Sequence, residues 1–375
     1  MRQTLIFLLM LLFLTGCATT DSSLLIPTAT VTFAPSATFT LAPTDTIPPT
    51  DTPVPTSTSI RTPPSLPGLL QTTLLNPLDP PHAYIGNTCQ YLQDKWSSKN
   101  SVPGTVVMPI MFHSVGGETG GSRISETDFH ALMQTLHADG FQAITTAQTA
   151  DFLEHNAKIP RLSVLLIVDD RRAVYYYDTL FRPYWEEYGW PVVNAWISLD
   201  DSIGAENLPG HVALEAEGWV DHQAHGFQHL PIGPDSSDEY ITQELQKPKD
   251  VFQENFHKQP IAFIWPGGDF TPHAAALARQ LGYRLGFTVN PRGPLMFNWI
   301  PLSDAMDSQR PSWIPEGPVN DPLLVLPRYW DTDAILHLAD VIQIGQDAAA
   351  YAGQNKAVEQ EYYDILCTPT LGPIP

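Results

Sequence analysis

Short apolar runs alternate with longer amphipathic stretches from Val106 onward. The first run, VVMPIMF, predicts a strand that ends at His113. The stretch ISETDFHALMQTLHADG spaces its apolar residues as a helix does, with Ser125 as its N-cap and Gly140 at its end. The further predicted strands are 141–145, 163–168, 191–199, 261–265, 284–289 and 323–330, and the further helices are 147–155, 178–188, 237–257, 272–281 and 333–350.

This alternation of strands and helices is typical of an α/β protein with a parallel sheet or barrel. The run 163–168 is apolar almost throughout, so we expect a strand that is buried on both faces. Pro248 predicts a kink or break in the helix 237–257. The segment 290–322 is long and irregular, and we expect it to form a loop over the site or a substrate groove.

Two polar motifs stand out against this pattern. Asp169 and Asp170 directly follow the central strand, and catalytic groups collect at such strand ends in α/β barrels. The stretch DHQAHGFQH places His225 and His229 four residues apart. Two imidazoles and one carboxylate are three ligands, the number that a catalytic zinc site uses while one position stays open for water. The alternatives are a helix cap or surface turn for the Asp pair and a solvated helix face for the His pair.

The first residues predict a targeting segment. Arg2 supplies a positive charge, residues 5–14 are apolar but too short for a stable membrane span, and LTGC ends at Cys17. This motif resembles the lipobox of bacterial lipoproteins, whose Cys becomes lipid-modified after cleavage, so we expect a lipoprotein signal peptide at 1–17. An ordinary signal peptide with an incidental Cys is the alternative. Residues 18–82, rich in Thr and Pro, are expected to be a disordered linker before a domain at 83–375.

The overall charge and the remaining cysteines narrow the picture further. The chain has 19 Lys and Arg against 40 Asp and Glu, a net charge of −21, which repels phosphate backbones and argues against nucleic-acid binding. Cys89 and Cys367 flank the folded region. Because export implies an oxidising compartment, we predict a disulfide between them, with two unrelated thiols as the alternative.

Five motifs follow one another along the chain: PIMFHSV, LLIVDDR, HGFQH, FIWPGGDF and LGYRLGF. They resemble, in turn, the Tyr-His strand, the TFDDG signature, the His-x-x-x-His motif, the FAYPYG-type loop and the GYR segment of the polysaccharide deacetylases. These are the NodB-homology domains of carbohydrate esterase family 4. The resemblance covers residues 106–333. It implies a distorted (β/α)7-type barrel that removes acetyl groups from an N-acetylated glycan, such as peptidoglycan, a chitin-like polymer or an exopolysaccharide.

The resemblance also implies roles for individual residues. Asp169 would be the general base, and His113 would be a structural or outer-shell residue. A divalent metal ion, usually zinc, would be held by three side chains. The expected metal ligands are Asp170, His225 and His229. The residues expected at the substrate are Trp265, Pro266, Gly267 and Gly268. A backbone N–H near this loop could add to an oxyanion hole.

Three positions depart from the family pattern. Arg171 stands where the family has Gly, and it could narrow the cleft or compete for the Asp pair. Trp265 replaces the Arg that orients the base, and we expect Arg328 to act in its place as a catalytic residue. The His that carries the general acid in the last family motif is not evident, since His337 lies in a predicted helix.

We therefore expect a metal-dependent hydrolase, anchored through a lipid at Cys17 to a membrane of the bacterial cell envelope and facing the extracytoplasmic side. Arg171, Trp265 and the missing His favour a second interpretation, a catalytically impaired glycan-binding module on the same scaffold. A third interpretation keeps the metal chemistry but changes the substrate to a non-sugar C–N bond. Release of acetate from a glycan separates the first interpretation from the second.

Overall fold

The computed structural model describes residues 61–116, 123–171 and 173–375. The predicted signal peptide, its Cys17 and the linker residues 18–60 lie outside these ranges. No helix in the described ranges is both long enough and apolar enough to cross a membrane.

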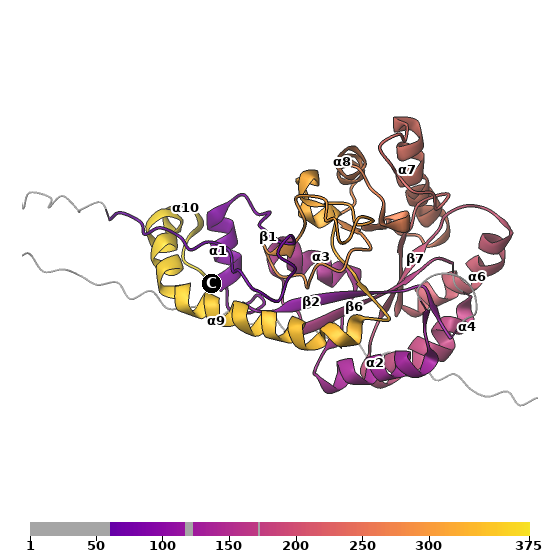
Figure 1. Ribbon diagram of the computed structural model, residues 1–375, viewed down its shortest axis with the longest axis horizontal. Helices are drawn as coiled ribbons and strands as arrows, with labels where there is room; N and C mark the ends of the chain where they lie inside the picture. The colour runs from indigo at the N-terminus through magenta and orange to yellow at the C-terminus, as the bar shows by residue number, and fades with distance from the viewer. Residues whose placement is uncertain (1–60, 117–122, 172) are drawn as a thin grey trace, which may run out of the picture. The chain divides into compact units, whose positions relative to one another are not determined.

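An eight-stranded sheet forms the centre of the described part of the chain. Its strands are β2 (Val106–Phe112), β5 (Gln142–Ala143), β6 (Leu162–Asp169), β7 (Val192–Trp196), β8 (Val220–Ala224), β9 (Ala262–Ile264), β10 (Leu285–Phe287) and β12 (Tyr329–Trp330). The main path runs β10-β9-β8-β7-β6-β2-β12 with all neighbours parallel, and β5 pairs with β6 beside it. The Leu326 amide donates to the Gly286 carbonyl and the Thr288 amide donates to the Leu326 carbonyl, which joins β10 to the segment that leads into β12. The sheet is therefore curled into a distorted barrel, as the sequence predicts (Figure 1).

Helices surround this sheet, and Figure 1 shows α2 and α9 on one side of β2 and β6, with α7 and α8 on the other. The helices are α1 (Thr88–Trp96), α2 (Glu126–Ala138), α3 (Thr146–His155), α4 (Val174–Tyr176), α5 (Arg182–Tyr188), α6 (Ser202–Glu217), α7 (Asp238–Asn255), α8 (Pro272–Gln280), α9 (Ala334–Leu366) and α10 (Thr368–Leu371). The Ser125 hydroxyl accepts from the Asp128 amide and caps α2, as predicted. Pro248 lies inside α7 without breaking it, so the predicted break is wrong.

The alternation of side chains along the central strand decides where the polar residues point. Leu166 and its alternate neighbours in β6 pack with α2 and α9, whereas Ile167 faces the inside of the curl. Asp169 is two residues after Ile167 and therefore shares the inner face. Because β2 pairs with β6 in register along its whole length, the residue after β2, His113, stands beside Asp169.

Residues 61–82, which the sequence assigns to the linker, pack on the folded domain. Leu69, Leu70 and Leu75 contact its apolar core. The strand β1 (Pro81–His82) pairs in antiparallel fashion with β11 (Ile300–Pro301). The predicted linker boundary at residue 82 is therefore wrong, because these residues bury apolar side chains against the rest of the domain.

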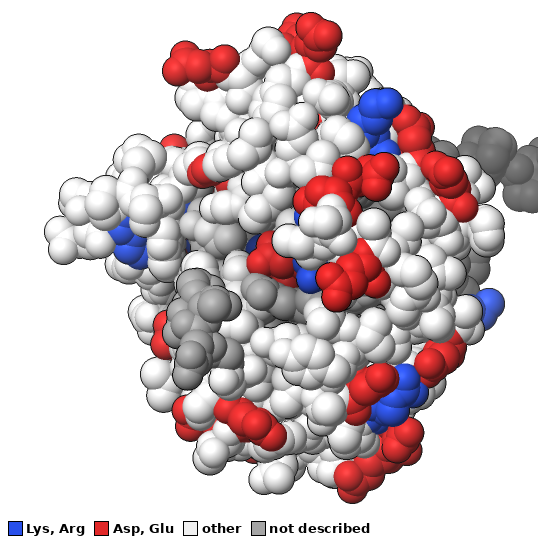
Figure 2. Space-filling view, turned by 90° about the vertical axis from the view of Figure 1, so that its right-hand side faces the viewer, with Lys and Arg blue, Asp and Glu red and all other residues white. Residues whose placement is uncertain are grey.

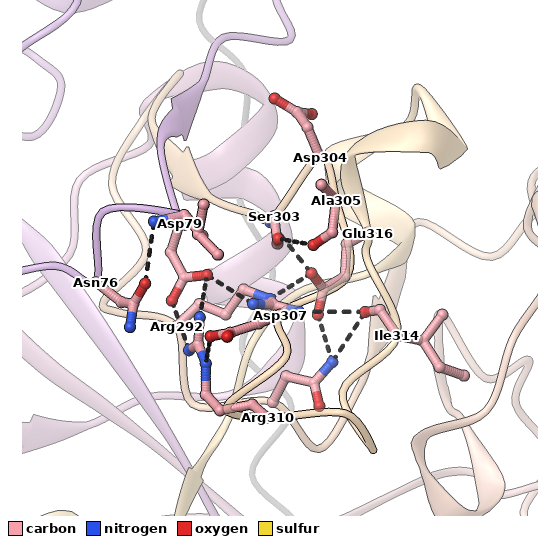
Figure 3. Close-up of polar contacts among 12 residues, drawn as sticks. Asn76, Asp79, Arg292, Ser303, Asp304, Ala305, Asp307, Arg310, Ile314 and Glu316 are labelled. Atoms are coloured by element: carbon pink, nitrogen blue, oxygen red, sulfur yellow. Dashed lines mark hydrogen bonds and ion pairs between the residues drawn. The ribbon is translucent and has the colours of Figure 1, made fainter.

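Buried ion pairs fix this N-terminal arm to the segment 290–322, as Figure 3 shows. Asp79, which is 1% exposed, accepts from Arg292 at 2.6 Å and from Arg310 at 2.8 Å. Arg292 also pairs with Glu316, which in turn accepts from the Asn290 amide group. Since each of these charges has a partner of opposite sign, the network avoids the cost of an uncompensated buried ion.

The segment 290–322 does not lie where the sequence suggests. Leu295 exchanges two backbone hydrogen bonds with Val107, at the N-terminal end of β2. His113 and Asp169 lie at the opposite, C-terminal ends of their strands. The expectation of a loop over the site is therefore wrong, since this segment packs with the N-terminal arm and the far end of β2.

Cys89 on α1 and Cys367, directly after α9, form a disulfide with Cα atoms 5.3 Å apart. The bond ties the first helix of the described chain to the last long helix. Helix α9 continues to Leu366, well beyond the predicted end at residue 350.

Candidate metal and catalytic site

The two carboxylates at the end of β6 serve different partners. Asp169 is the last residue of the strand and is buried, whereas Asp170 is partly exposed and has a φ of 70°. Such a left-handed conformation is strained for a residue other than Gly. The Asn194 side chain, from β7, donates to the backbone carbonyl of Asp170 at 3.0 Å and supports this turn. The backbone thus turns between the neighbouring acids and separates their environments.

His225 and His229 follow β8 and bring their imidazoles to Asp170. From Asp170 Oδ1 the distance is 3.7 Å to His225 Nε2 and 3.4 Å to His229 Nε2. One ligand atom from each of the three residues lies within 4.8 Å of the others. A single divalent ion can therefore contact all three at roughly 2 Å, the bond length of zinc to nitrogen and oxygen.

The protonation of His225 suits a metal ligand. Its Nδ1 lies 2.8 Å from the Ile264 carbonyl, and because a carbonyl only accepts, Nδ1 carries the hydrogen. This leaves the lone pair of Nε2 directed at the Asp170 and His229 side, as in other metal-binding imidazoles. Burial, helped by the neighbouring His229, lowers the pKa of His225 to about 4 against the attraction of the nearby carboxylates. The ring is thus neutral at pH 7, as ligation requires.

Arg328 holds the other carboxylate. Its Nη1 donates to Asp169 Oδ1 at 2.7 Å and its Nε donates to the Thr288 carbonyl at 2.6 Å. Both partners of this ion pair are buried. Burial alone would raise the pKa of Asp169, but Arg328, His225 and His113 outweigh it and hold that pKa well below its usual range. Asp169 is therefore an anion at neutral pH, and its Oδ2 is not used by Arg328.

His113 also lies at this site, although only a structural or outer-shell position was expected for it. Its Nε2 is 3.7 Å from Asp169 Oδ2, and its ring stacks on Trp330 with centroids 5.7 Å apart. The side chain remains 23% exposed, so a substrate can reach it. The observation that places His113 at the site is the pairing of two buried parallel strands, one followed by His113 and the other ending in Asp169.

The loop after β9 differs from the expectation. Trp265 is fully buried and its indole N–H donates to the Leu324 carbonyl, so the prediction that it contacts the substrate is wrong. Pro266 and Gly268 are buried too, whereas Gly267 is exposed. The Gly268 amide donates back to the Trp265 carbonyl and cannot act as an oxyanion donor in this conformation. Of the four residues expected at the substrate, Gly267 alone presents a surface.

Arg171 turns away from the Asp pair. Its guanidinium donates to both carboxylate oxygens of Asp201, at 2.7 and 2.8 Å, and to the Leu199 carbonyl at 2.8 Å. Asp201 is the N-cap of α6 and accepts from the Gly204 amide. Arg171 therefore supports the start of α6 and does not compete for the Asp pair.

The face that contains these strand ends is acidic. Helices α4 and α6 follow the ends of β6 and β7 at the right of Figure 1, and Figure 2 looks at this side. Asp and Glu gather around the hollowed centre of the face, with few Lys or Arg beside them. This distribution agrees with the net charge of −21 and favours the approach of cations over anions.

Residues 163–286 match the family model described as "Polysaccharide deacetylase". This part of the chain is therefore similar to the polysaccharide deacetylase family. The match includes the Asp pair, His225 and His229 and confirms the resemblance found in the sequence. His113 and Arg328 lie outside the matched range, directly after β2 and directly before β12.

Similar proteins include YxkH of Bacillus subtilis (strain 168), whose name assigns it provisionally to the polysaccharide deacetylases. It is 26% identical over 188 residues, which cover 48% of this chain and 64% of that protein, so the chain spans just under two thirds of its length.

The Streptococcus pyogenes deacetylase PplD, solved in complex with acetate, is 17% identical with a TM-score of 0.48, covering 62% of this chain and 97% of PplD. A polysaccharide deacetylase from Bacillus cereus is also 17% identical, with a TM-score of 0.47 and coverage of 63% and 69%.

Proposed function

We propose that this protein is a metal-dependent hydrolase that removes N-acetyl groups from an extracellular or cell-wall polysaccharide. The observation that carries the proposal is the placement of two adjacent acids. Asp170 Oδ1 lies 3.7 and 3.4 Å from the Nε2 atoms of His225 and His229, close enough for one ion to bind all three. Asp169 is held as a buried anion by Arg328. The family match and the name of the Bacillus subtilis relative support an N-acetylated glycan as the substrate class.

Asp170, His225 and His229 would hold the cation, and we propose zinc because borderline nitrogen and oxygen ligands in this number suit it. When bound, the ion would supply Lewis acidity that polarises the amide carbonyl and makes water more acidic. The Ile264 carbonyl fixes the tautomer and orientation of His225 toward that ion.

Proton transfers would fall to two side chains on neighbouring strands. Asp169 would accept a proton from the attacking water through Oδ2, since Oδ1 is bound to Arg328. His113 lies 3.7 Å from that oxygen and would donate a proton to the departing amine of the sugar. Trp330 would keep the His113 ring oriented through their stack. His113 would thus take the place of the general acid that no motif of the sequence indicates.

The glycan-binding alternative loses part of its support from the geometry. It rested on Arg171 and Trp265 and on the missing acid. Arg171 is engaged with Asp201, and Trp265 is a core residue, so neither disturbs the Asp pair. We therefore favour the enzyme.

Acetate release from N-acetylglucosamine oligomers tests the proposal. The protein with zinc should release acetate, and both metal-stripped protein and Asp169→Asn should lose this activity. Arg171→Ala is the matched control. It changes a residue next to the Asp pair, but the contacts that it removes are those with Asp201 and the Leu199 carbonyl. Binding of the oligomers without acetate release would favour the glycan-binding module. Release of another amine from non-sugar amides, with none from the oligomers, would favour the third interpretation.

We further propose that the protein is anchored to the cell envelope by a lipid on Cys17, on the support of the LTGC motif alone. Incorporation of a labelled fatty acid in the cell tests this. The label should be present in the wild type and absent from Cys17→Ala.

A further inference from the structure

The two imidazoles of the candidate metal site are fixed in different ways. His225 is buried and has a hydrogen bond from its Nδ1 to the Ile264 carbonyl. His229 has a side chain that is 38% exposed; its Nε2 lies 3.4 Å from Asp170 Oδ1, and among the described residues no hydrogen bond from outside this cluster restrains its ring. Its position therefore depends on the backbone that joins it to His225.

That backbone is a loop with unusual dihedral angles. Two His four residues apart can share a face of a helix, but residues 225–229 are not helical here. Gly226 has a φ of 74° and His229 a φ of 61°. A left-handed conformation is costly for His, and it persists only where the surroundings impose it.

A single carboxylate holds the middle of this loop. Glu244, on α7, is fully buried and accepts from the Phe227 amide at 2.9 Å and from the Gln228 amide at 2.9 Å. The loop is pressed against this side chain so closely that a Cβ at Gly226 would lie 2.7 Å from Glu244 Oε2. Hydrogen bonds between backbone N–H groups and a carboxylate are among the stronger ones in proteins.

We propose that Glu244 is a positioning residue for the metal centre, which sets the loop so that His229 joins His225 and Asp170 around one ion. The inference rests on the proposed metal site. Glu244 would act through the amides of Phe227 and Gln228 rather than by contact with the ion or the substrate. It would position His229 through the loop backbone, whereas the Ile264 carbonyl contacts the His225 ring itself.

Glu244→Gln tests the proposal, because it keeps the size of the side chain but turns an NH₂ group toward one of the two amides. The zinc dissociation constant, measured by competition with a chromophoric chelator, should rise by about 10-fold or more, the range found for residues that support metal ligands. Glu359→Gln is the matched control. Glu359 is 3% exposed and likewise accepts two N–H bonds, from Lys95 and Trp96 on another side of the domain, so its loss should leave zinc affinity unchanged.

A double-mutant cycle separates positioning from general loss of stability. His229→Ala should weaken zinc binding strongly in the wild type and only slightly in Glu244→Gln, where His229 is already displaced. Additive effects of the two changes would overturn the proposal, as would equal zinc affinity in Glu244→Gln and the wild type. Should Glu244→Gln fail to fold, Gly226→Ala pushes the loop off the same carboxylate and should give the same loss. A wild type that binds no zinc would instead refute the proposed function.

Discussion

Arg328 and Asp169 are 159 residues apart in the chain, yet Arg328 Nη1 donates to Asp169 Oδ1 over 2.7 Å inside the protein. Asp169 ends β6, and Arg328 precedes β12, with β2 between these strands in the sheet. The family position for such an Arg is occupied by the buried Trp265. Arg328, directly before β12, thus places a positive charge against the Asp169 carboxylate. Since solvent reaches neither side chain, each charge depends on the other.

Loss of Arg328 should therefore cost stability as well as activity. We expect Arg328→Met to lower the free energy of unfolding by about 3–5 kcal/mol, because it leaves the Asp169 carboxylate buried without a partner. Adding Asp169→Asn removes that charge and should recover part of the loss in urea unfolding, while acetate release stays abolished in both variants. Equal stability of the single and double variants would show that the charge of Asp169 is compensated elsewhere.

His113 should be required for turnover but not for metal binding. If it donates a proton to the leaving amine, His113→Gln should reduce kcat by about 10²–10⁴-fold, the usual contribution of a positioned acid. The zinc content per chain should remain that of the wild type, because His113 is not among the three clustered ligands. Trp330→Ala should cause a smaller loss by removing the ring that His113 stacks on. Wild-type kcat in His113→Gln would exclude this role.

The acid sensitivity of the fold should depend on His222. Its Nδ1 lies 2.8 Å from Glu215 Oε2 and its Nε2 lies 2.8 Å from His211 Nδ1, in a fully buried site that Lys258 and Asp221 also face. Burial lowers the pKa of His222, against the attraction of Glu215. The unfolded chain therefore takes up a proton near pH 6.5 that the folded protein resists, so stability falls as the pH drops through that value.

His222→Gln tests this dependence. The free energy of unfolding of metal-free protein should decrease between about pH 7 and about pH 5 in the wild type and decrease less in His222→Gln. The comparison stays above the range in which ordinary carboxylates titrate, so it isolates the histidine contribution. Identical pH profiles for the two proteins would contradict the assignment.

The parts of the fold that the sequence predicted well are those with strong local patterns. The apolar run of β6 and the capped, amphipathic α2 were placed within a few residues of their observed bounds. The missed elements have weak patterns. Helix α6 contains Gly204, Pro209 and Gly210, which lower helix propensity, and β8 has the sequence VDHQA, which lacks an apolar run. Both are stabilised by their neighbours in the barrel rather than by their own residues.

The errors at the site and at the chain start have a different cause, which is long-range contact. Residues 61–82 share the Pro-rich composition of a linker, yet Asp79 is buried by two arginines more than 200 residues away in the chain. Trp265 was expected at the substrate, but its indole N–H donates to the Leu324 carbonyl, a contact that no local pattern predicts. His113 was recognisable only through the pairing of β2 with β6, which no local pattern reports.

The Cys89–Cys367 disulfide should stabilise the fold without contributing to catalysis. It closes a loop with a sequence separation of 278, and cross-links of long loops restrict the unfolded chain most. We expect the double variant Cys89→Ser/Cys367→Ser to be about 2–5 kcal/mol less stable in urea unfolding.

Its acetate release below the unfolding transition should match the wild type, because α1 and the end of α9 lie outside the residues that form the candidate site. A reducing agent should destabilise the wild type to the level of the variant and leave the variant unchanged. Loss of acetate release in a still folded variant would instead mean that the bond shapes the active site through the long helix α9.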